Sequence, residues 1–360
     1  MTLAAEKARA LALRQRFEAA GAQPVDCAIL QPAGTLLDLY GEDIRTRAYV
    51  TTDPVQGEVM LRPDFTVPVV EAHMRDGAEP ARYTYAGEVF RRQEDHPERA
   101  SEYHQVGFEV FDRADPAAAD AEVFARFAEI LAPYALRPVT GDIGILTAAV
   151  AGLRTTDNRR AALMRHIWRP RRFRALLDRF SGRAPVPASR AALLAEDDPM
   201  ARAEPLIGLR DGAEIADRIA ALREDAAQPP LSREEVALLE GLLKVSETCP
   251  HALEHLRDIA VDLPAIAEAV DRFADRIAAL SARGVAVDRL HFEASYGRSS
   301  MEYYDGFVFG FVAPGQPGWP VVAGGGRYDA LTRQLGQGRA IPAVGGVIRA
   351  SLLLELEGGA

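Results

Sequence analysis

The chain has 360 residues, of which 26% are charged and 48% are apolar, and its formal net charge at pH 7 is −10. This composition excludes fibrous, disordered and membrane-embedded proteins, and the length admits two domains or one large domain with an insertion. The acidic balance argues against nucleic acid as the main partner, because binding a phosphate backbone requires a basic face.

The cysteines and the N-terminal segment predict where the protein resides. Cys27 and Cys249 have no metal-like spacing, which is typical of a reducing cytoplasm. Residues 3–20 predict an amphipathic helix with internal charges that ends at Gly21, and they contain no apolar run suited to a signal peptide or membrane span. We therefore expect a cytoplasmic protein without a membrane partner.

The next elements lead to the motif LRPDFT at residues 61–66. Residues 25–39 predict a short strand, a turn and a helix, and residues 45–65 predict a hairpin that turns between Asp53 and Gly57. Pro63 suits the first turn of the following helix. Asp64 and Thr66 either cap that helix or contact a ligand, and the pattern leaves both interpretations open.

Residues 82–112 predict two strands joined by a charged loop. In the second strand, alternation places Gln105, Gly107 and Glu109 on one face and an apolar set on the other. Gln105 and Glu109 are then roughly 13 Å apart, with Gly107 as a floor without a side chain between them. That span suits an amino acid with a polar tip, hydrogen-bonded at both ends. The alternative is a half-buried edge strand whose Glu109 meets an arginine or water.

The middle of the chain is helical in pattern. An amphipathic helix begins at Asp115 and Pro116 and ends near Pro133, and residues 140–285 are rich in Ala, Leu and Arg. We expect residues 151–285 to be a helical insertion or second domain beside a core of residues 1–150 and 286–360. The arginines between Arg154 and Arg179 either form a solvated helix face, the favoured interpretation, or contact an acidic partner or nucleic acid.

One motif in this region imitates a metal site. His251, Glu254 and His255 match an inverted zinc-protease pattern, but no further ligand is apparent, so we expect an ordinary surface helix after Thr248–Pro250 and no metal. The sequence also contains no GxSxG motif, no CxxC pair and no cysteine–histidine arrangement at nucleophile spacing. We therefore expect no catalytic residue.

Strands return after residue 287. Residues 301–314 predict one strand, with Tyr303 on one face and Tyr304 beside Gly306 on the other. Residues 320–336 predict a strand, a glycine turn and a helix, and residues 341–359 a strand, a tight turn and an apolar helix.

Together these motifs resemble the class II aminoacyl-tRNA synthetases, and within them the histidyl branch. The resemblance spans most of residues 1–150 and 286–360. It is carried by LRPDFT, by GEVFRRQ at 87–93 followed by YHQVGFEVF at 103–111, by MEYYDGFVF at 301–309 and by AGGGRYDAL at 323–331. It implies an α+β fold with an antiparallel sheet flanked by helices, a homodimer and a histidine pocket.

The resemblance also implies which residues meet the ligand. Asp64, Thr66 and Gln105 would meet the α-amino group of histidine, and Glu109 and Tyr304 would meet its imidazole. Tyr303 and Arg91 complete the expected histidine-binding set, in which Arg91 is a substitute for a missing arginine that faces the carboxylate.

The departures from the synthetase pattern concern nucleotide binding. Ser299 replaces the arginine that opens the RGLDYY motif, and the neighbouring Arg298 is expected to point elsewhere. Gln93 replaces the glutamate of FRxE. With residues 344–346 aligned to the third motif, Leu352 replaces the arginine that stacks on adenine, and Arg349 is out of step with that position. Ala28 also replaces a proline of the first motif, and the chain stops at Ala360, without the anticodon-binding domain.

A histidine pocket beside a broken ATP site resembles the family of ATP phosphoribosyltransferase regulatory subunits. The resemblance implies a non-catalytic subunit without a cofactor, which joins a short-form catalytic subunit in a hetero-oligomer at the first step of histidine biosynthesis and confers feedback by histidine. The first alternative is a truncated histidyl-tRNA synthetase paralogue that activates an amino acid for a non-tRNA acceptor. A tRNA-sensing module is a further alternative, disfavoured by the acidic charge.

Overall fold

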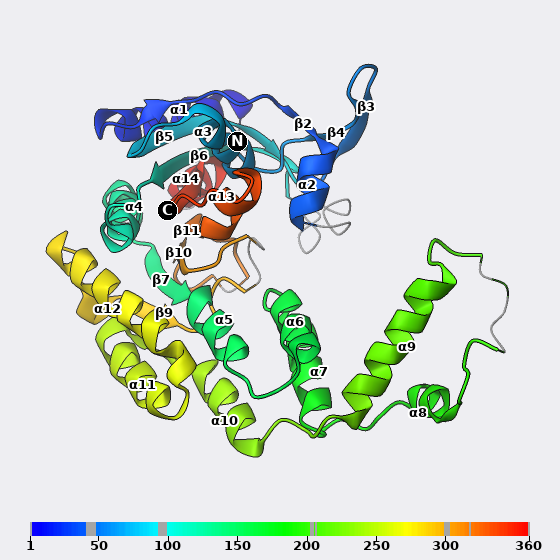
Figure 1. Cartoon of the computed structure of the whole chain (residues 1–360). Helices are drawn as coiled ribbons and strands as arrows, with labels where there is room; N and C mark the ends of the chain where they lie inside the picture. Colours follow the sequence, from blue (N-terminus) through cyan, green and yellow to red (C-terminus); the bar gives the residue numbers. More distant parts are fainter. Residues whose placement is uncertain are drawn as a thin grey trace.

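The computed structural model describes residues 2–40, 48–92, 99–201, 205, 207–298, 303–316 and 318–358. Within these residues, nine strands form one mostly antiparallel sheet, in which only the pairs β1–β5 and β7–β9 are parallel (Figure 1). In spatial order the strands are β1 (Gln23–Pro24), β5 (Ala81–Phe90), β6 (Glu102–Phe111), β12 (Ala343–Arg349), β11 (Ala323–Arg327), β10 (Phe307–Val312), β7 (Arg137–Asp142), β9 (His291–Glu293) and β8 (Ser246–Thr248). The predicted α+β class is confirmed.

A smaller sheet and a group of helices accompany the large sheet. The small sheet has the order β2 (Leu30–Pro32), β4 (Gly57–Leu61) and β3 (Val50–Asp53). The helices here are α1 (Leu3–Ala19), α2 (Ala33–Tyr40), α3 (Thr66–Asp76), α4 (Pro116–Leu131), α13 (Asp329–Leu335) and α14 (Ala350–Gly358). The helix predicted from residue 3, the hairpin turning between Asp53 and Gly57, and the helix that Asp115 caps are confirmed.

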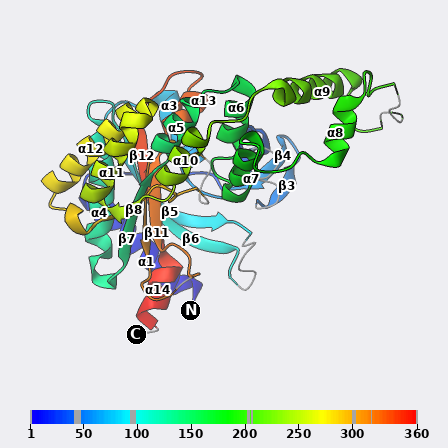
Figure 2. The same cartoon turned by 90° about the horizontal axis from the view of Figure 1, so that it is seen from below.

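The middle of the chain is mostly helical, as predicted, although β7 ends inside it at Asp142 and a further strand, β8, lies within it. Its helices are α5 (Ile143–Ala151), α6 (Asp157–Arg165), α7 (Pro170–Phe180), α8 (Ala188–Ala195), α9 (Gly212–Ala227), α10 (Arg233–Leu242), α11 (Cys249–Asp262) and α12 (Ala267–Ala282). Seen from below, α8 and α9 project away from the sheet (Figure 2). This β8 is the edge strand of the large sheet, while α12 packs on α4. The proposed boundary at residues 151–285 stays a prediction.

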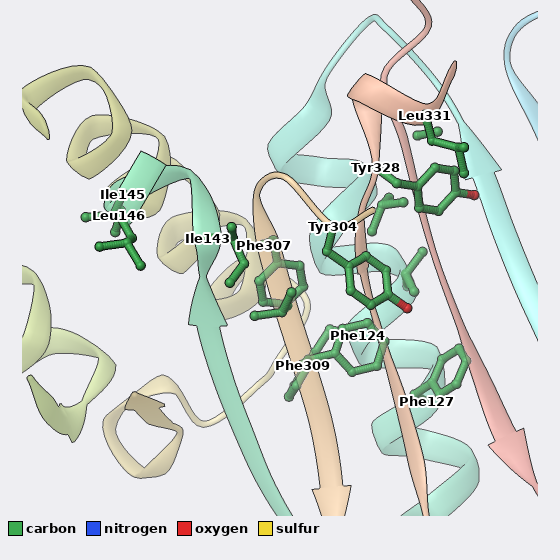
Figure 3. Close-up of a cluster of buried hydrophobic side chains, with 14 of the residues drawn as sticks. Phe124, Phe127, Ile143, Ile145, Leu146, Tyr304, Phe307, Phe309, Tyr328 and Leu331 are labelled. Carbon is green, nitrogen blue, oxygen red and sulfur yellow. The ribbon is translucent and has the colours of Figure 1, made fainter. Parts of the chain in front are cut away.

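One face of the large sheet carries the main hydrophobic core. Phe17 of α1 stacks on Phe108 of β6, with ring centroids 5.1 Å apart. Phe124 and Phe127 of α4 lie 5.7 and 5.4 Å from the ring of Phe309 on β10 (Figure 3). Buried aromatic rings in edge-to-face contact stabilise such a layer beyond the area they remove from water. The opposite face carries the polar residues Gln105 and Glu109 among buried aromatic rings such as Tyr85 and Phe111.

Four predictions of element boundaries are wrong. Gly324–Gly326 lie inside β11 rather than in a turn, and Gly345 and Gly346 lie inside β12, which continues directly into α14. The strand expected from residue 301 begins only at Phe307, so Tyr303 and Tyr304 precede it, while residues 301 and 302 lie outside the described part. The helix expected at Pro63 begins at Thr66. Glycine reads as a turn signal in sequence, but these glycines leave space for side chains from other elements.

Candidate functional site

Glu109 lies at the centre of the polar face, on a strand that is paired on both sides. β6 pairs with β5 and with β12, which places Glu109 between Tyr83 and Gly345. Its side chain is fully buried. The edge-strand alternative is therefore wrong. Residue 345 must be glycine because the Glu109 carboxylate lies close to its backbone: a Cβ there would lie 1.5 Å from Oε2 of Glu109.

Three hydroxyl groups donate hydrogen bonds to the Glu109 carboxylate. Thr66 Oγ1 and Tyr85 Oη lie 3.1 and 2.7 Å from Oε1, and Tyr328 Oη lies 2.6 Å from Oε2. Burial raises the pKa of Glu109 to about 7, although the three hydroxyl donors oppose this change. A carboxylate offers about four lone-pair positions. It therefore retains capacity to accept one further hydrogen bond, for example from a ring N–H of a ligand.

The floor predicted at Gly107 is not open. A Cβ at Gly107 would lie 2.0 Å from Cζ of Tyr85, so the glycine makes room for this tyrosine ring rather than for a ligand. The same relation recurs along the face: a Cβ at Gly326 would lie 2.8 Å from Cδ1 of Tyr304. Glycines in neighbouring strands thus allow tyrosine rings to approach the sheet closely.

Tyr304 and Tyr303 form an aromatic wall beside Glu109. Tyr304 is buried, and its ring centroid lies 4.9 Å from that of Tyr303, which in turn lies 6.0 Å from that of Tyr328. Figure 3 shows Tyr304 and Tyr328 with their hydroxyl groups turned to the same side, away from Ile143 and Ile145. Burial raises the pKa of Tyr304, and the nearby Glu109 charge adds to this effect, so its hydroxyl stays neutral and can donate.

Asp64, Thr66 and Arg91 lie in the same polar cluster: Thr66 bonds to Glu109, and the charges of Asp64 and Arg91 both act on Tyr304. Asp64 Oδ1 accepts from the Val67 N–H at 3.4 Å, and Nη2 of Arg91 lies 3.7 Å from Oδ2 of Asp64. Arg91 also donates to the carbonyl of Pro63 at 2.9 Å. Asp64 therefore bonds the first turn of α3, whereas the Thr66 hydroxyl is directed to Glu109 and does not cap the helix.

Gln105 lies on the same face as Glu109, as predicted, and is 2% exposed. Its Oε1 has no hydrogen-bond partner among the described residues. The structure thus gathers the predicted set of Asp64, Thr66, Gln105, Glu109, Tyr303, Tyr304 and Arg91 around one part of the sheet. Two Glu109 partners, Tyr85 and Tyr328, were not predicted. Tyr328 belongs to the motif at 323–331, which is the signal that could have identified it. Tyr85 has no such signal, because only the pairing of Tyr85 with Gly107 across the strands places its ring over the glycine.

Three of the positions at or beside the departures from the synthetase pattern lie within the described residues. Arg298 points away, as predicted: its guanidinium lies 4.8 Å from the ring centroid of Phe173 and donates to the Ile167 carbonyl at 2.8 Å. Leu352 is buried in α14, and Ala28 is exposed. Gln93 and Ser299 lie outside the described residues.

The motif that imitates a metal site is an ordinary surface helix, as predicted. α11 begins at Cys249, and the exposed His251 and His255 bond to Thr248 at 2.9 Å and Glu247 at 3.0 Å. In the part of the chain that the structure describes, no three His, Cys, Asp or Glu side chains are placed to hold a metal ion. Among the same residues, no helix is long and apolar enough to cross a membrane.

Comparison with known proteins decides the family. The family model described as histidyl-tRNA synthetase matches residues 2–352. A relative from Brucella anthropi, named ATP phosphoribosyltransferase regulatory subunit, is 34% identical over 92% of this chain and 93% of its own length. A protein of the same name from Brucella ovis is 34% identical over 96% of both chains. The chain belongs to the family of ATP phosphoribosyltransferase regulatory subunits.

Solved structures agree on the fold of this family member. A protein from Bacillus halodurans, described as an ATP phosphoribosyltransferase regulatory subunit/histidyl-tRNA synthetase, aligns with a TM-score of 0.69 at 19% identity and covers 98% of this chain and 78% of that one. A histidyl-tRNA synthetase from a Nostoc species aligns with a TM-score of 0.65 at 17% identity, over 98% of this chain and 72% of that one. The predicted resemblance to both groups is confirmed, and the relatives' name agrees with the predicted regulatory, non-catalytic role.

Proposed function

We propose that this chain is a non-catalytic subunit that binds free histidine in the Glu109 pocket and regulates a short-form catalytic ATP phosphoribosyltransferase subunit. The complex acts at the first step of histidine biosynthesis, in the cytoplasm, and histidine is its feedback effector. The chain forms a homodimer within the hetero-oligomer. The cytoplasmic location is supported by two free, partly or fully buried cysteines.

The assignment of histidine as the ligand rests on the capacity of Glu109 to accept a further hydrogen bond. Thr66, Tyr85 and Tyr328 already bond to this buried carboxylate, and the neutral Tyr304 hydroxyl lies nearby. An imidazole presents one N–H donor and one acceptor nitrogen, so it matches a carboxylate and a neutral hydroxyl. A side chain without nitrogen leaves these buried groups unpaired, which costs about 1–3 kcal/mol per group.

Calorimetric titration of the purified chain with histidine and with leucine tests this pocket. We expect histidine to bind and leucine not to bind, and Glu109→Ala to weaken histidine binding by roughly 10- to 100-fold. Glu268→Ala is the matched control, because Glu268 is 89% exposed on α12. Equal affinity for the two amino acids, or wild-type affinity in Glu109→Ala, contradicts the assignment.

The truncated-synthetase alternative makes a different prediction. It requires a cationic group at the phosphates, and Arg298, next to the position that supplies it in synthetases, lies on Phe173 instead. We therefore expect no histidine-dependent exchange of pyrophosphate into ATP. Pyrophosphate exchange clearly above background would favour the truncated-synthetase alternative over the regulatory role.

A further inference from the structure

Two buried polar groups beside Arg349 lack hydrogen-bond partners among the described residues. Tyr103 and Gln105, 5% and 2% exposed, are on the same face of β6, and Tyr103 Oη and Gln105 Oε1 accept or donate no hydrogen bond there. Arg349 of β12 stands directly opposite Gln105 in the strand register. Its guanidinium carbon lies 5.7 Å from the ring centroid of Tyr103. Groups that are buried and polar are normally paired, so the cluster calls for an explanation.

Arg349 has an unusual electrostatic environment for a partly buried arginine. No ion pair between Arg349 and a carboxylate is found in the described part of the chain, and Arg91 and Arg99 lie close enough to repel its charge. Burial lowers the pKa of Arg349, and the two neighbouring arginines lower it further. Holding a guanidinium in such a position without an anion costs free energy in the ligand-free protein.

The unpaired atoms define the chemistry that would satisfy them. Gln105 Oε1 is an acceptor and needs a donor, the Arg349 guanidinium has only donors and needs an acceptor, and the Tyr103 hydroxyl can do either. Hydrogen phosphate would satisfy Arg349 and could donate its hydroxyl to Gln105 Oε1, but it is too short to contact Glu109, roughly 13 Å along the strand, as well. The head group of a free amino acid carries both an ammonium donor and a carboxylate acceptor, so it can pair with all three.

The cluster is also placed correctly relative to Glu109. Glu109, Gln105 and Arg349 project from one face of the sheet, because Gly345, opposite Glu109, and Arg349, opposite Gln105, are four residues apart on β12. The Tyr85 ring covers Gly107 between these groups, so a ligand that contacts Glu109 and also reaches Gln105 and Arg349 lies across that ring.

We propose that Arg349, assisted by the Tyr103 hydroxyl, binds the α-carboxylate of the amino acid whose side chain reaches Glu109. This inference rests on the proposed histidine pocket and deepens it. The carboxylate-facing group then comes from the end of β12, not from the synthetase position at Ser299. The subsite selects free amino acids over ligands that share the imidazole but lack the carboxylate.

The test compares histidine with histidinol, in which a hydroxymethyl group replaces the carboxylate. By calorimetry, the wild-type chain should bind histidine roughly 10- to 100-fold more tightly than histidinol, the range for a charge-assisted hydrogen-bonded pair. Arg349→Met should lose this preference, with weaker histidine binding and unchanged histidinol binding. Arg272→Met, at a 55% exposed arginine on α12, is the matched control and should behave as wild type.

A second variant and a second readout guard against a merely structural effect. Tyr103→Phe removes only a hydroxyl and should weaken histidine several-fold without changing histidinol binding. Thermal denaturation of ligand-free Arg349→Met should give a midpoint no lower than that of wild type, because an unpaired charge has been removed. Equal loss of both ligands in Arg349→Met, or unchanged histidine binding, overturns the proposal.

Two further outcomes separate this inference from the proposed function. If the wild-type chain binds histidine and Glu109→Ala loses it while Arg349→Met does not, only the Arg349 subsite is wrong. If the wild-type chain binds neither histidine nor histidinol, the histidine pocket itself fails and the subsite with it. Inorganic phosphate that binds as tightly as histidine in an Arg349-dependent manner would identify a phosphate site and overturn the carboxylate assignment.

Discussion

At the scale of single residues, the protonation of Glu109 links the site to stability. Burial raises the pKa of this carboxyl from 4.5 to about 7 in the folded protein. The folded protein therefore holds this proton more tightly than the unfolded chain does. The resulting stabilisation is fully present below about pH 4.5 and is lost as the pH rises through about 7.

This difference predicts how the free energy of unfolding changes with pH. Between about pH 4.5 and pH 8, the free energy of unfolding of the wild-type chain should fall by up to about 3 kcal/mol relative to that of Glu109→Gln, whose side chain does not titrate in this range. Urea denaturation of both proteins at fixed ionic strength measures the difference. A difference that stays constant with pH, or that grows in favour of wild type as the pH rises, would show that the folded pKa of Glu109 is not raised.

At the scale of elements, β12 depends on glycine at the point where it passes Glu109. A Cβ at Gly345 would lie 1.5 Å from Glu109 Oε2 and 2.9 Å from the backbone oxygen of Phe108, and neither paired strand can withdraw. Gly345→Ala should therefore abolish histidine binding and destabilise the fold by about 1–3 kcal/mol, the usual cost of overpacking. The readouts are calorimetry and urea denaturation.

Gly34→Ala supplies the matched control for that substitution. Gly34 lies in α2, and a Cβ there meets nothing within 4 Å. Alanine favours helix over glycine, so this variant should be as stable as wild type or slightly more stable. If Gly345→Ala proves equally harmless, the close packing of β12 against Glu109 is not as described.

Helix α12 is joined to the sheet layer by a buried ionic network. Arg276 donates to Asp120 at 2.9 Å and to Asp142 at 2.7 Å, and Asp120 also accepts from Arg327 at 2.6 Å. Asp142 caps the N-terminus of α5, where its carboxylate accepts from the Gly144 N–H at 2.8 Å. One arginine thus connects α12 with α4 and with the start of α5.

Removing Arg276 leaves buried carboxylates with too few partners. Arg276→Met should lower the free energy of unfolding by about 3–5 kcal/mol, the range found when one member of a buried ion pair is removed. Arg272→Met, one turn earlier on the same helix at a 55% exposed position, should change it by less than about 1 kcal/mol. Similar urea midpoints for the two variants would contradict a structural role for the network.

At the scale of the whole molecule, regulation requires histidine to favour one arrangement of the complex over another, since a ligand with equal affinity for both shifts nothing. Couplings of about 1–3 kcal/mol correspond to roughly 5- to 150-fold changes in affinity, and they are reciprocal. We therefore expect a substrate bound to the catalytic partner to weaken histidine binding by a factor in this range.

The measurement is co-purification with a short-form catalytic subunit, followed by histidine titration and phosphoribosyl-ATP assays with and without this chain. Glu109→Ala should still join the complex but should remove its sensitivity to histidine. If the proteins do not associate at micromolar concentration, or if adding this chain changes neither turnover nor histidine sensitivity, the regulatory proposal fails.

Local patterns in the sequence predicted most of the elements and most of the residues of the candidate site. Alternation along residues 103–111 assigned Gln105 and Glu109 to one face, and the motifs identified Asp64, Thr66, Tyr303 and Tyr304, because period-2 patterning and short motifs are local properties of the chain. The same local rules read Gly324–Gly326 and Gly345–Gly346 as turns, since glycine is the usual turn residue.

The contacts of those glycines and of the unpaired polar groups depend on the assembled sheet. Strand order places β12 beside β6, so Gly345 meets the Glu109 carboxylate and Arg349 stands opposite Gln105. Pairing of β5 with β6 places the Tyr85 ring over Gly107 and its hydroxyl on Glu109. These contacts join residues far apart along the chain. No local pattern encodes them, because register and strand order are fixed by packing of the whole sheet.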